Sequence, residues 1–204
     1  MSSPHSWATR LLHGSLATAV CFQLLTSLIM QAPSPSHAEN VFFELHKNSG
    51  IIVVGLVLLF WGVIVTRRFG TPADLLFPSF RACRRAALMA DVKRHAWALR
   101  RRSLPDFQDA SPLAAAGHGL GFLLVTVMAA TGIIWEIVRV TGVVGEPGQG
   151  LLLGLHSLTS TFVWAYLIIH GLMALFHHFS GEQSLRSMWS IGRTGSKGRA
   201  QREG

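Results

Sequence analysis

The sequence predicts an all-α membrane protein, a bundle of four transmembrane helices with a further amphipathic helix between the second and third. Half of the 204 residues are hydrophobic and only 14% are charged, a balance that soluble domains of this size rarely show. Each predicted span is long enough to cross a hydrocarbon core of about 30 Å, and each has a histidine within it or beside it. The spans are 7–30, 43–66, 113–140 and 151–176.

The first span competes with another interpretation, a cleaved signal peptide. Small residues follow the apolar stretch, at Ala32-Pro33-Ser34 and Ser36-His37-Ala38, as at a cleavage site. The apolar stretch is longer than the usual signal core of about 7–15 residues. We therefore expect a retained helix, which also keeps His13 in the protein.

Basic residues predict the orientation of the spans. They are frequent in the connection 67–112 and in the tail 179–204, and absent from the connections 31–46 and 141–150. Because lysine and arginine mark cytoplasmic connections, both termini are predicted inside, in a bacterial inner membrane. A single transmembrane domain, 1–178, would then precede a basic cytoplasmic tail. The net charge of +8 fits attraction to anionic lipid, and we do not expect nucleic-acid binding.

The connection between the second and third spans contains a predicted amphipathic helix, from Arg81 to Arg102. Apolar residues recur there at helical spacing among arginines: Met89, Val92, Ala96 and Leu99. The pattern is typical of a helix on the inner membrane surface, with Trp97 as an interfacial anchor. A docking surface for a partner protein is the alternative. Ser111-Pro112 then predicts a cap and first turn for the third span.

Four histidines are predicted to form two pairs at two membrane depths. His156 and His170 are 14 residues apart in the fourth span, so they share one helix face, within roughly 40°, and are separated by roughly 21 Å along the axis. His46 opens the second span at the outer surface, and His13 lies about 9 Å from the inner end of the first. His46 therefore pairs with His156, and His13 with His170. Paired imidazoles at matched depths are what a six-coordinate haem requires.

The haem type follows from the cysteines. Neither Cys21 nor Cys83 belongs to a CxxCH or CxxC motif, so the two haems would be held without a covalent bond, as haem b. A histidine-lined transporter without haem is a different interpretation of the same residues, because ionisable groups in spans also mark ion pathways.

Further polar residues are candidates for supporting roles. His118 shares the inner layer with His13 and His170, and spacing alone leaves the choice of axial ligands open; we assign His118 to a hydrogen bond with a propionate or a quinone. His177 and His178 at the inner boundary are either interfacial polar groups or part of a quinone site. Arg10 and Lys47, each within a turn of a proposed ligand, either neutralise haem propionates or snorkel to the surface.

Glycines lie close to the proposed ligands, at Gly14, Gly154 and Gly171, and about one and two turns after His46, at Gly50 and Gly55. They predict room for a flat macrocycle. Close packing of helices is the equal alternative, since small residues serve that purpose in membranes generally.

The chain resembles the bacterial cytochrome b-561 family, within the wider group that includes the b-type cytochromes of nickel-iron hydrogenases. The resemblance covers nearly all of the chain except about 71–109. It rests on Thr9-Arg10-Leu11-Leu12-His13, His46, Gly117-His118, His156 with thirteen residues before His170, and His177-His178. Two departures are Gly14, where the family often has tryptophan, and a longer, more arginine-rich inner loop.

The resemblance implies a four-helix bundle with two b haems, the first and fourth helices ligating the inner haem and the second and fourth the outer one. It implies electron transfer across the inner membrane between an outer donor, such as superoxide or a small redox partner, and ubiquinone or menaquinone. The longer loop favours the alternative function, a membrane-anchoring electron-transfer subunit of a larger dehydrogenase or hydrogenase-type complex. Redox partner proteins are then expected at either face.

Overall fold

The computed structural model describes residues 7–33, 36–66, 76–77, 81–101 and 111–179. This described part of the chain forms α1 (Trp7–Ser27), α2 (Val41–Thr66), α4 (Ala82–Arg100), α5 (Pro112–Thr141) and α6 (Glu146–Phe179). Helices thus lie over all four predicted spans and over the predicted amphipathic segment. Most of the basic connection outside α4, and the tail 180–204, lie outside the described residues.

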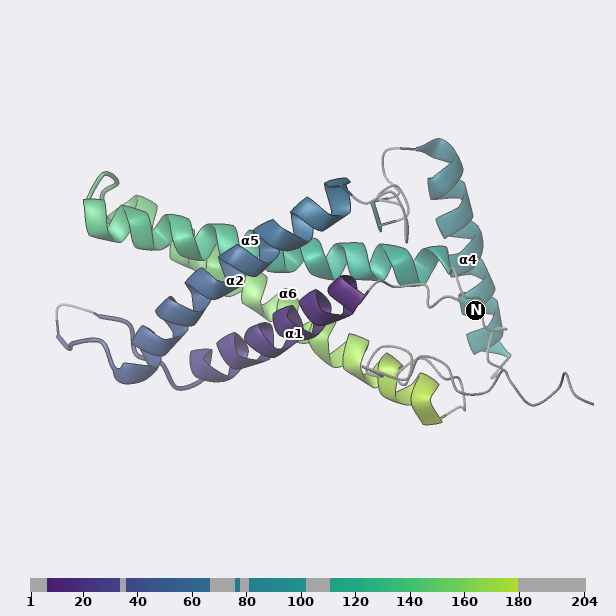
Figure 1. The fold of residues 1–204 in the computed structure, drawn as a ribbon, viewed down its shortest axis with the longest axis horizontal. Helices are drawn as coiled ribbons and strands as arrows, with labels where there is room; N and C mark the ends of the chain where they lie inside the picture. The colour runs from purple at the N-terminus through teal and green to yellow at the C-terminus, as the bar shows by residue number, and fades with distance from the viewer. Residues whose placement is uncertain (1–6, 34–35, 67–75, 78–80, 102–110, 180–204) are drawn as a thin grey trace, which may run out of the picture.

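Two helical hairpins make up the bundle. α1 packs against α2, α5 packs against α6, and α2 joins the hairpins by packing against α5. Figure 1 shows the α1–α2 and α5–α6 connections at the same end of the bundle, with α4 crossing the opposite end of α5. The two connections without basic residues therefore share one end, and the arginine-rich α4 lies at the other.

Three helices of the described chain, α2, α5 and α6, are long and apolar enough to cross a membrane. Their apolar side chains largely face outward; Leu58 and Ile169 are more than 60% exposed. Such a surface is stable only in an apolar solvent, so these helices belong in lipid. α1 is 21 residues long, enough for a core of about 30 Å, but it carries Arg10, His13, Gln23 and Thr26, which lower its hydropathy.

A small core holds the hairpins together. It contains Leu16, Val20 and Leu24 of α1, Val53, Val57 and Ile64 of α2, Phe122 and Val125 of α5, and Val163 of α6. The largest buried contribution comes from α1 and α2, and α6 adds one residue. α6 is therefore positioned mainly through its pairing with α5.

Polar side chains fix the helix ends. Asn40 Oδ1 accepts from the Phe43 amide at 3.0 Å, which caps α2, and also from the Gln31 amide at 3.0 Å, which ties the end of α1 to it. α5 begins as predicted, with Ser111 as its cap and Pro112 in its first turn, and ends at Gly142 with φ 65°. A left-handed residue of this kind favours glycine.

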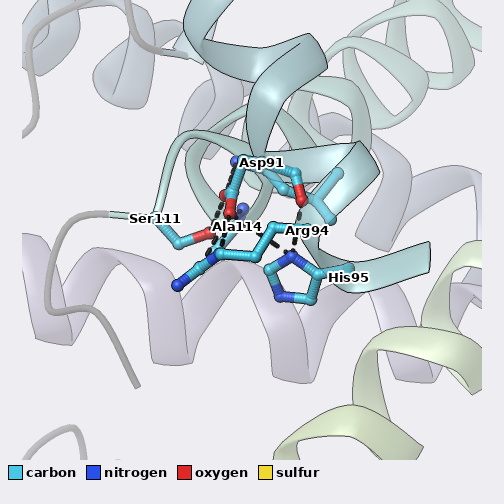
Figure 2. A network of polar contacts seen from close by, with 6 residues as sticks. Asp91, Arg94, His95, Ser111 and Ala114 are labelled. Atoms are coloured by element: carbon cyan, nitrogen blue, oxygen red, sulfur yellow. Dashed lines mark hydrogen bonds and ion pairs between the residues drawn. The ribbon is translucent and has the colours of Figure 1, made fainter. Parts of the chain in front are cut away.

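α4 is joined to the start of α5 by a buried carboxylate, Asp91 (Figure 2). Asp91 Oδ2 accepts from the Ser111 hydroxyl at 2.6 Å and from the Leu113 amide at 3.1 Å, and Oδ1 accepts from Arg94 Nη2 at 2.7 Å. Burial by itself would raise the pKa of Asp91, but the hydrogen bonds from Ser111, Leu113 and Arg94 outweigh it, so the pKa lies below its ordinary value. The charged carboxylate also suits the positive end of α5.

The face of α4 that packs on α5 is centred on Asp91 and Ala98, which are buried. The predicted apolar positions Met89 and Val92, and the predicted anchor Trp97, are exposed instead. The Arg101 guanidinium lies 3.7 Å from the Trp97 ring centre. α4 therefore presents an apolar and basic face away from α5.

Candidate functional site

A cavity near the end with the α1–α2 and α5–α6 connections brings four helices together. It is lined mostly by apolar side chains from α1, α2, α5 and α6, with the His46 and His156 rings among them. The ring centres of these two histidines are 6.3 Å apart and their planes are nearly perpendicular, at 85°. We name this pair and its surroundings the His46 site.

The His46 ring is held by α1. Its Nδ1 lies 3.1 Å from Thr26 Oγ1 and 3.1 Å from the Gln23 carbonyl oxygen. Gln23 Nε2 also donates to the His46 carbonyl, at 2.8 Å, and to Ser49 Oγ, at 2.9 Å. α1 thus fixes both the backbone and the ring of His46.

The His156 ring is held by α5 in the same way. Its Nδ1 lies 3.0 Å from Thr131 Oγ1, and the Met128 carbonyl accepts a hydrogen bond from the ring. Gly132 lies directly against the ring, since a methyl group added there would approach His156 Cε1 to 3.1 Å. Each ring is therefore oriented by a neighbouring helix: α1 orients His46 of α2, and α5 orients His156 of α6.

These hydrogen bonds assign the ring tautomers. A carbonyl oxygen only accepts, so the nitrogen facing Gln23 must carry the proton. The single hydroxyl proton of Thr131 is directed to the Val127 carbonyl, 2.8 Å away, and that of Thr26 to the Phe22 or Gln23 carbonyl, 3.0 Å away, so both hydroxyls accept from Nδ1. Each neutral ring then keeps a lone pair on Nε2, the form that binds a metal.

Charged side chains surround the mouth of the His46 site. Lys47 forms an ion pair with Glu39 at 3.5 Å, and Arg139 with Glu136 at 2.8 Å. Lys47 and Glu136 both line the cavity. The apolar cavity thus has one cation, Lys47, and one carboxylate, Glu136, in its lining.

A second group of rings lies toward the other end of the bundle. The His118 and His170 ring centres are 5.1 Å apart at 84°, and Tyr166 stacks on His170 at 5.3 Å and 14°. Gly121 is needed for this stacking, because a Cβ there would collide with the Tyr166 ring. We name this group the His170 site.

The remaining predicted residues are placed as follows. His13 lies half-buried on α1, and Arg10 lies one turn before it. Arg10 Nε is buried with no hydrogen-bond partner among the described residues. His177 and His178 fall in the last turns of α6, and their side chains lie outside the described residues.

The glycines divide into two kinds. A methyl group added at Gly14, Gly154 or Gly171 would meet nothing within 4 Å beyond its own helix backbone, within the described chain. Gly121, in contrast, is closely packed. Close helix packing therefore does not account for Gly14, Gly154 and Gly171. Gly154 and Gly171 lie on the exposed surface of α6, and none of the three glycines lines the cavity of the His46 site.

Sequence reasoning missed the residues that orient the rings: Gln23, Thr26, Thr131, Gly132 and Tyr166. A signal was available for the threonines, since each is a polar residue in an apolar span at the depth predicted for His46 and His156. Tyr166 is the only tyrosine of the chain and lies one turn before His170.

Histidine rings gathered between apolar helices, with their metal-binding nitrogens free, define the class: a membrane helical bundle that binds a metal cofactor between its helices. The family profile of prokaryotic cytochrome b561 matches residues 4–190, and the chain belongs to that family. It is therefore a membrane b-type cytochrome that transfers electrons. No curated protein and no solved structure matches the chain.

The residues at the His46 site fit a b-type haem. Two imidazoles on opposite sides of one metal have ring centres roughly 6 Å apart, given metal–nitrogen bonds of about 2.0–2.1 Å, and the observed separation is 6.3 Å. The apolar side chains of four helices that surround the two rings also suit a macrocycle. Family membership also favours haem over the haem-free transporter.

Proposed function

We propose that the chain holds two haems b and passes electrons from a donor at the outer face to a membrane quinone at the inner face. The outer face is the end of the bundle with the α1–α2 and α5–α6 connections. His46 and His156 would ligate the outer haem, and His13 and His170 the inner one. The observation that carries the proposal is the His46–His156 pair, with both Nδ1 atoms bonded and both Nε2 atoms free.

The distance between the His118 and His170 rings favours a role for His118 other than that of an iron ligand. Its ring centre is 5.1 Å from that of His170, closer than two rings on opposite sides of a metal. His118 Nδ1 is bonded to its own helix, 2.8 Å from the Ala114 carbonyl oxygen, which leaves Nε2 for a propionate or a quinone. His13 is then the second inner ligand, as the family resemblance implies.

Cations near each pair have proposed roles as propionate partners. Arg10 Nε lacks a partner among the described residues, and a carboxylate would supply one. Lys47 at the His46 site would exchange its 3.5 Å pair with Glu39 for a propionate. Bound haem would supply reversible one-electron transfer.

Proton delivery is assigned to the inner histidines. Reduction of a quinone to the quinol takes up two electrons and two protons. His118, together with His177 and His178 at the boundary, would pass those protons from the inner side to the quinone, because an imidazole can both accept and donate a proton. The quinone is ubiquinone or menaquinone.

The proposal is tested by purifying wild type, His156→Ala and His170→Ala in mild detergent. Haem content and the reduced-minus-oxidised spectrum are measured, together with reduction of a short-chain quinone by xanthine oxidase-generated superoxide or by a reduced small redox protein. Wild type should contain two haems b, and each variant should lose a different one and all quinone reduction. Loss of both haems, or of neither, in either variant would contradict the pairing.

A second candidate function is a membrane-anchoring subunit of a larger dehydrogenase or hydrogenase-type complex. The exposed face of α4 favours it, because Trp97, Arg101 and Met89 are presented outward from a helix that Asp91 anchors. The subunit proposal predicts that purified protein contains haem but reduces a quinone only after a partner is added. Steady quinone reduction by the protein alone would rule it out.

A further inference from the structure

The two histidines of the His46 site share a feature that the His170 site lacks. Each ring donates from Nδ1 to a threonine hydroxyl on a neighbouring helix, which is Thr26 of α1 for His46, at 3.1 Å, and Thr131 of α5 for His156, at 3.0 Å. At the His170 site, the His118 ring bonds a carbonyl of its own helix. His170 packs against Tyr166, and among the described residues its ring has no hydrogen bond.

A hydrogen bond accepted from Nδ1–H makes the opposite nitrogen more basic. A more basic imidazole donates more charge to iron, which stabilises the ferric state over the ferrous state and lowers the reduction potential. Hydrogen bonding around the ligands is one of the means by which proteins set haem potentials. When both imidazole ligands of one iron make such a hydrogen bond, both bonds lower its reduction potential.

We propose that Thr26 and Thr131 are positioning residues that fix both imidazoles of the His46 site and lower the reduction potential of the haem they hold. The inference rests on the proposed function, in which His46 and His156 ligate one iron. A lower potential at the outer haem favours electron transfer away from it, toward the inner haem. The threonine pair thus biases the direction of electron flow.

Each ring is also held by a backbone carbonyl, so the threonine hydroxyl is not its only hydrogen-bond acceptor. The Gln23 carbonyl also accepts from His46 Nδ1, and the Met128 carbonyl accepts from the His156 ring. The tautomer should therefore survive removal of either hydroxyl. The expected effect is a change of potential and of ring orientation, with the haem retained.

The experiment is a spectroscopic redox titration of the purified holoprotein, with low-temperature EPR of the ferric state. The variants are Thr131→Val and Thr26→Val, which keep side-chain shape, and Thr131→Ser, which keeps the hydroxyl. The control is Thr159→Val, because Thr159 lies half-buried on α6 and its hydroxyl donates to the Leu155 carbonyl of its own helix, at 2.7 Å.

Each valine variant should raise the potential of the His46-site haem and change its EPR g-values, while the other haem is unaffected. Outer-shell partners of metal ligands typically contribute about 10- to 100-fold, and about tenfold in the ferric–ferrous balance is about 59 mV for one electron. The double variant should shift furthest. Thr131→Ser and Thr159→Val should match wild type.

Loss of the His46-site haem in Thr131→Val, with retention in Thr131→Ser, also supports the positioning role. The inference is overturned if both valine variants keep two haems with wild-type potentials and g-values. That result differs from failure of the proposed function, in which wild type lacks two haems or His156→Ala retains both.

Discussion

At the residue scale, the central problem is how a histidine ring with two nitrogens is satisfied inside an apolar bundle. An unpaired polar atom in hydrocarbon is costly, and here Nδ1 of His46, His156 and His118 each has an acceptor within about 3 Å. His46 and His156 also line the apolar cavity. At the His46 site this division suits the proposed ligand role, because Nδ1 orients each ring and Nε2 is left for the cofactor.

Small residues beside the rings give a prediction for the His46 site. In Gly132→Val the added side chain would press on His156, where even a Cβ comes within 3.1 Å of the ring, so the ring must turn. We expect the apparent affinity of that site for haem to fall by about 10-fold or more. Titration of apoprotein with haem measures this. Gly62→Val, at a position with nothing within 4 Å, is the control, and equal affinity in both variants would contradict the contact.

The equivalent prediction at the His170 site concerns Gly121. In Gly121→Ala the new methyl group collides with Tyr166, which must leave the face of His170. The spectrum and potential of the inner haem should change while those of the outer haem stay constant. Redox difference spectra resolve the two. A change confined to the outer haem would show that Tyr166 acts elsewhere.

At the element scale, α4 is held by one carboxylate rather than by an apolar face. Asp91 bonds the cap residue Ser111, the Leu113 amide and Arg94 (Figure 2). Its position explains why the pattern of Met89, Val92 and Ala96 predicted the helix but not the face that packs on α5. Sequence periodicity identifies the apolar side of a helix, whereas a buried charge with several donors depends on where another helix begins.

Removing that carboxylate should release α4. In Asp91→Ala the Ser111 hydroxyl and Leu113 amide lose their acceptor, and hydrogen bonds to a charged group contribute about 1.5–3 kcal/mol each. We expect hydrogen-exchange protection of α4 to fall by about tenfold or more, as measured by mass spectrometry in nanodiscs. Lys93→Gln, on the exposed side of α4, should leave protection unchanged. Wild-type protection in Asp91→Ala would exclude the anchoring role.

The same contact predicts a pH dependence. The pKa of Asp91 is lowered in the folded protein, so its stabilising effect is fully present above the unfolded value of about 3.9. It is lost as the pH falls through the lower folded pKa. A nitroxide on Cys83, in a background with Cys21→Ser, should become mobile only at pH values below about 4. Mobility that already rises near pH 6 would point to another group.

At the scale of the whole molecule, the connections define two ends. The α1–α2 and α5–α6 connections share one end and α4 lies at the other (Figure 1), as the distribution of lysine and arginine predicts. A membrane-impermeant maleimide should therefore label Cys83 only in inverted vesicles, and an introduced Val144→Cys only in right-side-out cells. Labelling of both from the same side would overturn the predicted topology.

Much of the fold was predictable because helix length and hydropathy determine it. The segments around α2, α5 and α6, and the Ser111-Pro112 start of α5, follow from local composition. That α1 also crosses the membrane stays a prediction, because Arg10, Gln23 and Thr26 reduce its hydropathy and it is not among the three candidate spans of the described chain. Gln23 and Thr26 contact His46 of α2. The proximity of His46 and His156 followed from depth, since both lie near the start of their helices.

The orienting residues could not be predicted, because they depend on how each helix is rotated about its axis. Depth places Thr131 near His156, but only the packing of α5 against α6 turns its hydroxyl toward the ring. The same holds for Tyr166, whose stacking on His170 requires Gly121 on the facing helix. Close contact between His118 and His170 likewise depends on rotation, and spacing alone left three inner histidines equivalent.

The central claim is that His46 and His156, from separate helices, bind the same iron. The most direct measurement is haem content with redox difference spectra for His46→Ala, His156→Ala and the double variant, beside His170→Ala. All three changes at the first pair should remove one and the same haem, with no further loss in the double variant, and His170→Ala should remove the other. If His46→Ala and His156→Ala remove different haems, or their effects add, the two rings do not share an iron.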